Sequence, residues 1–126
     1  MRKHYYFRPS ANGFDAWDVD HLVELSRALP VQEIDIASLA DIDSVYWIGA
    51  DGSAPTVRIL VSHMKLVEKV DLSYPIILGA DGRVMDGMHR VAKALLEERA
   101  TVSAVRFKVQ PEPDFRDVQP ADLPYE

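Results

Sequence analysis

Three basic side chains, His89, Arg90 and Lys93, fall in the first two turns of a helix that we expect to begin near Gly87, within the segment VMDGMHRVAKAL at residues 84–95. A helix N-terminus carries the positive end of the macrodipole and backbone N–H groups without intrahelical acceptors. A cation there therefore costs a few tenths to about 1 kcal/mol. Two explanations are open: neighbouring carboxylates compensate the cations, or a bound anion such as a phosphate does so.

Each of these residues also has a purely structural explanation. Asp86 stands just before the expected helix, where Asp commonly caps the first turn. Lys93 precedes Glu97 by one turn, and the two side chains could form an ion pair. A lone histidine is usually structural. The grouping of all three basic residues at one helix start, after a strand and a glycine, is what favours a phosphate site.

Composition excludes several other classes of site. The formal net charge of −6, from 14 basic and 20 acidic residues, argues against a general nucleic-acid-binding protein, which needs a basic face. The chain has no cysteine, so a disulfide, a thiolate metal site and a cysteine nucleophile are excluded. The four histidines have no metal-ligand spacing such as HExxH, and no metal site is predicted.

No stretch approaches 18 uninterrupted apolar residues, and the N-terminus lacks the apolar region of a signal peptide. These features predict a cytoplasmic protein without membrane association.

The 126 residues suit one globular domain over residues 1–110, followed by a proline-rich, acidic and irregular tail over residues 111–126. The oligomeric state is not predicted.

Hydrophobic periodicity predicts alternating strands and helices. The expected strands are residues 3–8, 31–36, 44–48 and 101–107, together with two short strands joined by a hairpin turn at Ala80 to Gly82. The expected helices are residues 16–29, 55–70 and 87–97.

Apolar residues at helical spacing mark the buried face of each expected helix. In the first helix these are Leu22, Leu25 and Leu29; in the second, Val57, Leu60, Val61, Met64 and Val67; in the third, Met88, Val91, Ala92 and Leu95. The expected architecture is α+β, a small mixed sheet with the second and third helices packed on it. Tyr46 and Trp47 could stack a nucleobase beside the GADGSAP loop, although aromatic residues in strands are more often core.

The segment PIILGADGRVMDGMHRVAKALLEERATVSAVRF, residues 75–107, resembles the core of the ParB/sulfiredoxin-like superfamily. In that superfamily a short apolar strand, a turn and a D-G-x-H-R or G-C-H-R motif at a helix start form a nucleotide-phosphate site. The likeness is close over residues 74–107 and loose over residues 31–73. It implies the small mixed sheet of that fold.

The resemblance also implies roles for individual residues. Gly87 would let the backbone approach a phosphate, while His89 and Arg90 match residues that contact nucleotide phosphates. Asp86 would cap the helix or take part in proton transfer or metal contact. Tyr74 matches a position near the nucleotide.

The departures from the superfamily pattern matter as well. Sulfiredoxins carry their catalytic cysteine where this chain has Met88, so that activity is excluded. ParB proteins have an arginine where His89 stands and add a DNA-binding domain, so a DNA-associated role is not expected. In serine-kinase-like members a carboxylate acts as general base, and Glu33 is a candidate here.

Two functions are therefore expected ahead of a DNA-associated or nuclease-like one. The first is a phosphotransferase acting on an unknown small molecule. Gly87, Met88, His89, Arg90, Lys93 and Tyr74 would bind the nucleotide, and Asp86 or Glu33 would act in catalysis. The second is a nucleotide-sensing module without turnover. The nucleotide would be ATP, ADP or CTP, with or without Mg²⁺.

Overall fold

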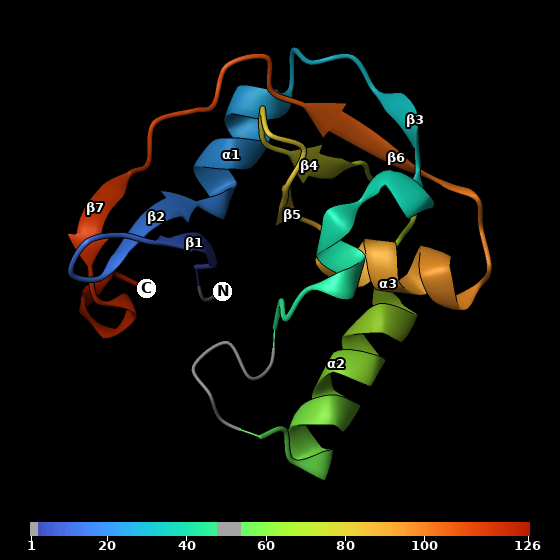
Figure 1. The fold of residues 1–126 in the computed structure, drawn as a ribbon, viewed down its shortest axis with the longest axis horizontal. Helices are drawn as coiled ribbons and strands as arrows, with labels where there is room; N and C mark the ends of the chain where they lie inside the picture. The colour runs from blue at the N-terminus through green and yellow to red at the C-terminus, as the bar shows by residue number, and fades with distance from the viewer. Residues whose placement is uncertain (1–2, 48–53) are drawn as a thin grey trace.

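The computed structural model describes residues 3–47 and 54–126, which form two small sheets and three α-helices (Figure 1). The strands are β1 Tyr5–Pro9, β2 Phe14–Asp18, β3 Gln32–Asp35, β4 Ile76–Leu78, β5 Val84–Asp86, β6 Thr101–Arg106 and β7 Phe115–Val118. The helices are α1 Val19–Ser26, α2 Val57–Lys69 and α3 Met88–Leu96, with short 3₁₀ helices at Ile36–Ser38, Ala40–Asp43 and Pro120–Asp122. The expected α+β class is confirmed.

The larger sheet has the order β3–β6–β4–β5, in which β4 and β6 are parallel and the other pairs antiparallel. Because side chains alternate across a strand, Ile76 and Leu78 of β4 enter one core with α3, while Ile77 enters a second core. This second core also contains Trp17 of β2 and Leu22 of α1. The sheet is therefore covered on both faces, which explains the unbroken apolar run in β4.

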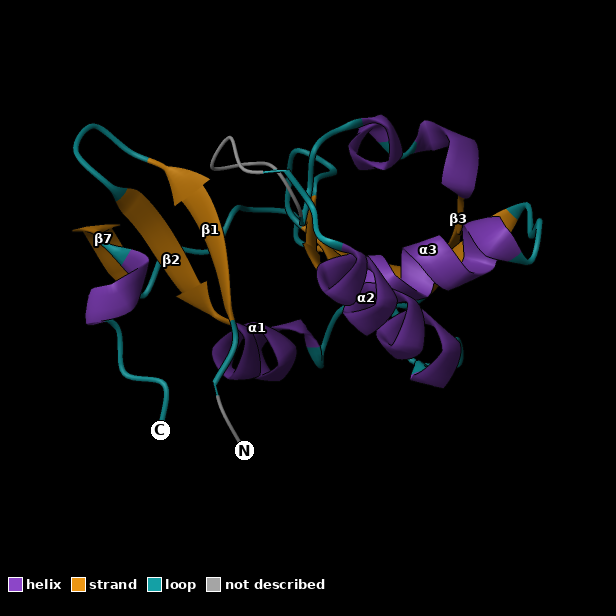
Figure 2. Ribbon diagram, turned by 90° about the horizontal axis from the view of Figure 1, so that it is seen from below, coloured by secondary structure: helices purple, strands orange, loops and turns teal. Residues whose placement is uncertain are grey.

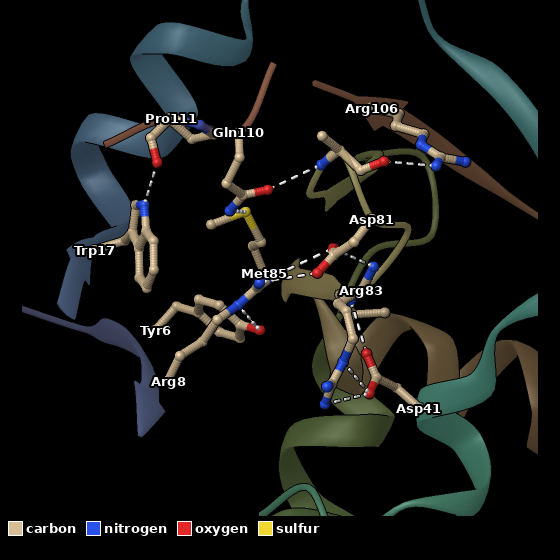
Figure 3. Close-up of polar contacts among 12 residues, drawn as sticks. Tyr6, Arg8, Trp17, Asp41, Asp81, Arg83, Met85, Arg106, Gln110 and Pro111 are labelled. Carbon is tan, nitrogen blue, oxygen red and sulfur yellow. Dashed lines mark hydrogen bonds and ion pairs between the residues drawn. The ribbon is translucent and has the colours of Figure 1, made fainter. Parts of the chain in front are cut away.

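The β4–β5 hairpin leads directly into α3, as expected. Polar contacts from β1, from β6 and from the segment after β6 hold its turn in place (Figure 3). Arg8 of β1 pairs with Asp81 in the turn at 2.8 Å. The side-chain Oε1 of Gln110 accepts the Ala80 N–H at 2.9 Å, and Arg106 Nη2 donates to the Ala80 backbone carbonyl at 2.7 Å. The hairpin thus fixes where α3 begins.

The expected helix over residues 16–29 is wrong at both ends. Residues Phe14–Asp18 form β2, which pairs with β1, and the helix runs only from Val19 to Ser26. The Asp18 side chain accepts the Asp20 N–H at 2.9 Å and so caps the helix. Leu22 is buried, but Leu25 is exposed because it lies outside the packed face.

Two expectations in the middle of the chain are also wrong. Residues 44–47 do not form a strand; Ile48 and residues 49–53 of the expected loop lie outside the described residues. Helix α2 forms, capped by Thr56, but it packs against α3 rather than on the sheet (Figure 2). It buries no side chain fully. Neither α2 nor another helix of the described residues is long and apolar enough to cross a membrane.

The C-terminal segment is not an irregular tail. Residues Phe115–Val118 form β7, which pairs with β2 and completes the sheet β1–β2–β7. Pro111 accepts the Trp17 indole N–H at 2.8 Å through its carbonyl, and Leu123 is buried. The prolines are compatible with this short edge strand because they lie outside its paired residues.

Candidate functional site

The first turn of α3 has backbone donors without acceptors. Gly87 is the N-cap residue, with a φ of +100°, and no side chain caps the helix. Among the described residues no acceptor faces the N–H groups of Met88 or His89, which are the first two residues of the helix. Asp86 therefore does not cap the helix, although it directly precedes Gly87.

The Arg90 side chain folds back over Gly87. Its Nη2 lies 3.1 Å from Asp86 Oδ2, and the side chain is only 18% exposed. A Cβ atom on residue 87 would lie 2.8 Å from both Arg90 Nη2 and Ile76 Cγ2. The open space expected above Gly87 for a phosphate is therefore filled by the guanidinium and by Ile76.

Arg90 still has donor capacity to spare. Its Nε is buried and has no hydrogen-bond partner among the described residues. A guanidinium has five N–H donors, whereas with the described residues it makes only the Nη2 contact with Asp86. An unsatisfied buried donor is unfavourable by about 1–3 kcal/mol, so a turn of the guanidinium that brought this atom to an added acceptor would be favourable.

His89 belongs to a cluster of three rings. Its Nε2 lies 2.9 Å from Nδ1 of His63 in α2, so one ring donates a hydrogen bond to the other. Both imidazoles stack on Trp47, with ring centroids 4.3 Å and 4.6 Å from the indole. Burial, and secondly the neighbouring His63, lower the pKa of His89. Both effects favour the neutral form of the His89 ring over the cation.

Lys93 has partners in α2. Its Nζ donates to the carbonyl groups of Glu68 at 3.1 Å and Val70 at 2.9 Å, at the C-terminal end of that helix. The negative end of the α2 dipole thus compensates this cation. The alternative pairing with Glu97 does not form, because Glu97 pairs with Arg99.

An apolar cavity of about 330 Å³ adjoins the start of α3. It is lined by the segment before α2 and by one face of α3: Asp41, Ile42, Ser44, Val45, Tyr46, Trp47, Met88, Val91, Ala92 and Leu95. Met88 contributes both to this cavity and to the first turn of α3. Leu95, expected to be buried, is 51% exposed at this cavity, while Ala94 takes the buried position.

Two predicted site residues lie elsewhere. Glu33 is on β3, separated from β5 by two strands, or roughly 14 Å at the usual strand spacing. Its carboxylate accepts hydrogen bonds from Thr101 and Ser103 at 3.0 and 2.6 Å. Tyr74 lies in the turn before β4 and is 63% exposed. The structure brings together Asp86, Gly87, Met88, His89 and Arg90, but it does not bring Glu33 to them.

The sequence interpretation missed His63 and Asp41. His63 contacts a histidine 26 positions away, and no local pattern predicts such a pair. Asp41 is 5% exposed; it accepts the Val84 N–H at 2.8 Å and pairs with Arg83 at 3.0 Å (Figure 3). The available signal was that Asp41 stands in the short, largely apolar turn ASLADI, residues 37–42. An acidic residue in such a turn indicates a carboxylate that accepts hydrogen bonds in the core.

Comparison of the chain with protein-family models, curated proteins and solved structures finds no match. The resemblance to the ParB/sulfiredoxin-like superfamily therefore stays a prediction. Among the described residues, no group of three or more histidine or acidic side chains could hold a metal ion.

Proposed function

We propose that this protein binds a nucleotide, with its phosphates at the start of α3 and its base in the adjoining cavity. The observation that carries the proposal is the set of donors without acceptors at this point: the N–H groups of Met88 and His89 and the buried Nε of Arg90. Phosphate oxygens are suitable acceptors for both kinds of donor. A phosphate would approach beside Gly87, because Arg90 already covers that residue.

The cavity supports a ligand with a flat apolar part. Tyr46 and Trp47 are among its lining residues, and aromatic side chains can stack on a nucleobase. Small-molecule sites are mostly apolar, with a few polar groups that orient the ligand. Because Met88 belongs to both regions, one molecule with a ring and a phosphate group can reach both.

For phosphotransfer to a small molecule, we propose Asp86 as the proton-accepting carboxylate, with Mg²⁺ brought by the nucleotide. Glu33 is no longer proposed, since it lies at the opposite edge of the sheet. Binding without turnover is the second candidate. The ion pair between Asp86 and Arg90 favours it, because a carboxylate held by a guanidinium is less available to take a proton.

Calorimetric titration with ATP, ADP and CTP, with and without Mg²⁺, tests the proposal. Replacing Arg90 with Ala should weaken binding about ten- to a hundredfold, because it removes one charge-assisted contact of about 1.5–3 kcal/mol. Arg99→Ala is the matched control, since Arg99 is exposed and its one ion pair within the described part of the chain is with Glu97, near the other end of α3. It should leave the affinity unchanged.

Absence of binding by the wild-type protein at millimolar nucleotide would contradict the proposal, as would equal affinity of the Arg90→Ala variant. Thermal melts without ligand check that this variant is folded, since it also loses the ion pair with Asp86. Release of phosphate in the presence of candidate small-molecule acceptors distinguishes the phosphotransferase from the sensor.

A further inference from the structure

Helix α2 leaves most of its apolar surface uncovered. Along one side of it, Val57 is 78% exposed, Met64 62%, Leu60 45% and Val61 40%. A helix of 13 residues is marginally stable in water unless a partner covers its apolar face. Contiguous exposed apolar patches of this kind mark interaction surfaces.

The attachment of α2 to the rest of the protein uses a different side of the helix. His63 contacts His89 and Trp47, and Lys93 binds the carbonyl groups at the C-terminal end of α2. At 100° per residue, His63 lies about 100° around the helix from the centre of the exposed side. Figure 1 shows α2 extending away from both sheets.

The charges on and beside the exposed side suit a second copy of the same helix. Leu60, Met64 and Glu68 follow one another at intervals of four residues on the exposed side. Arg58 is at the opposite end of the helix and on its flank, about 110° from the centre of the exposed side and away from His63. Neither Arg58 nor Glu68 has an ion-pair partner among the described residues. When two such helices run antiparallel, Arg58 of each copy lies opposite Glu68 of the other.

We propose that α2 is the interface of a homodimer in which two copies of this helix pack antiparallel about a twofold axis. Leu60 of one copy then faces Met64 of the other, and each Arg58 pairs with a Glu68. A twofold interface needs a surface that is complementary to itself, and the opposite placement of these two charges supplies it. A lipid surface fits less well, because Glu68 continues the row of Leu60 and Met64 and would have to enter the apolar layer.

The dimer should be of moderate strength. Two short helices bury less than a standard interface of about 1,600 Å², so we expect a dissociation constant in the micromolar range. Sedimentation velocity and light scattering on the full chain, from about 1 to about 200 µM, cover this range. The mass should rise from monomer to dimer across the series.

Met64→Lys should leave the protein monomeric throughout this range, because it places a charge at the centre of the interface. Leu96→Lys is the matched control: Leu96 is an apolar residue, 71% exposed, at the end of α3 and outside the proposed surface. It should dimerise like the wild type. Circular dichroism confirms that both variants are folded.

Charge reversal tests the antiparallel arrangement. Arg58→Glu and Glu68→Arg should each weaken self-association, by roughly tenfold, because each replaces two attractive contacts by two repulsive ones. An equimolar mixture of the two variants should associate as tightly as the wild type, since every contact between unlike copies is again attractive.

A wild-type protein that stays monomeric up to the highest concentration would overturn the proposal. So would a dimer that survives Met64→Lys, or a mixture of the charge variants that associates no better than either alone. Binding of monomeric protein to anionic vesicles through α2 would assign the surface to lipid instead.

Discussion

Replacing Gly87 with Ala should destabilise the protein by about 2–5 kcal/mol. The first contribution is conformational: a φ of +100° costs a residue with a Cβ about 1–2 kcal/mol. The second is steric, because the new Cβ would lie 2.8 Å from Arg90 Nη2 and from Ile76 Cγ2. The guanidinium can swing away, but Ile76 is fully buried, so we add about 1–3 kcal/mol for overpacking.

Gly82→Ala is the control that separates the two contributions. Gly82 also has a positive φ, +82°, but the nearest atoms to a Cβ there would be those of the Arg106 guanidinium at 3.8 Å, an ordinary contact. This variant should lose about 1–2 kcal/mol, the conformational part alone. Urea unfolding followed by circular dichroism measures both variants. Equal losses in the two variants would refute the argument that Arg90 and Ile76 close over Gly87.

Two further predictions concern polar groups, the half-buried His89 and the buried Asp41. Stability should fall as the pH is lowered from about 7.5 to about 5.5: the pKa of His89 is lower in the folded state, so unfolded chains bind more protons in this window. Thermal melts should show a shallower fall for His89→Gln, and an unchanged slope would contradict the assignment. Asp41→Ala should cost about 2–4 kcal/mol in urea unfolding, since it removes a buried acceptor of the Val84 N–H and an ion pair with Arg83. Glu97→Ala, which breaks an exposed pair with Arg99, should cost less than about 1 kcal/mol, and similar losses for both would argue against a special role for Asp41.

Local signals predicted the part of the fold around the candidate site. The turn at Ala80 to Gly82, the apolar β4 strand and Gly87 before a helical pattern were enough to place the hairpin and α3. Each of these signals acts within a few residues, through backbone conformation or the alternation of side chains. The predicted grouping of Asp86, Gly87, His89 and Arg90 follows directly, because they are consecutive or nearly so along one strand and one helix.

The sequence was misread where the structure of a segment depends on partners far away along the chain. Residues 16–18 carry no strong preference of their own and become strand because β1 and β7 flank them. The tail residues 115–118 become strand for the same reason, despite the neighbouring prolines. The apolar stripe of α2 indicated a helix correctly but gave no information on whether its own chain would cover it.

The sequence by itself determined that basic residues stand at the start of α3 and that the helix begins there. Only the tertiary structure decided what compensates them: Asp86 for Arg90, the α2 carbonyl groups for Lys93, and His63 with Trp47 for His89. The physical reason is that charge and helical periodicity are properties of neighbouring residues. The acceptor that a side chain reaches depends instead on how α2, α3 and the segment before α2 cross in space.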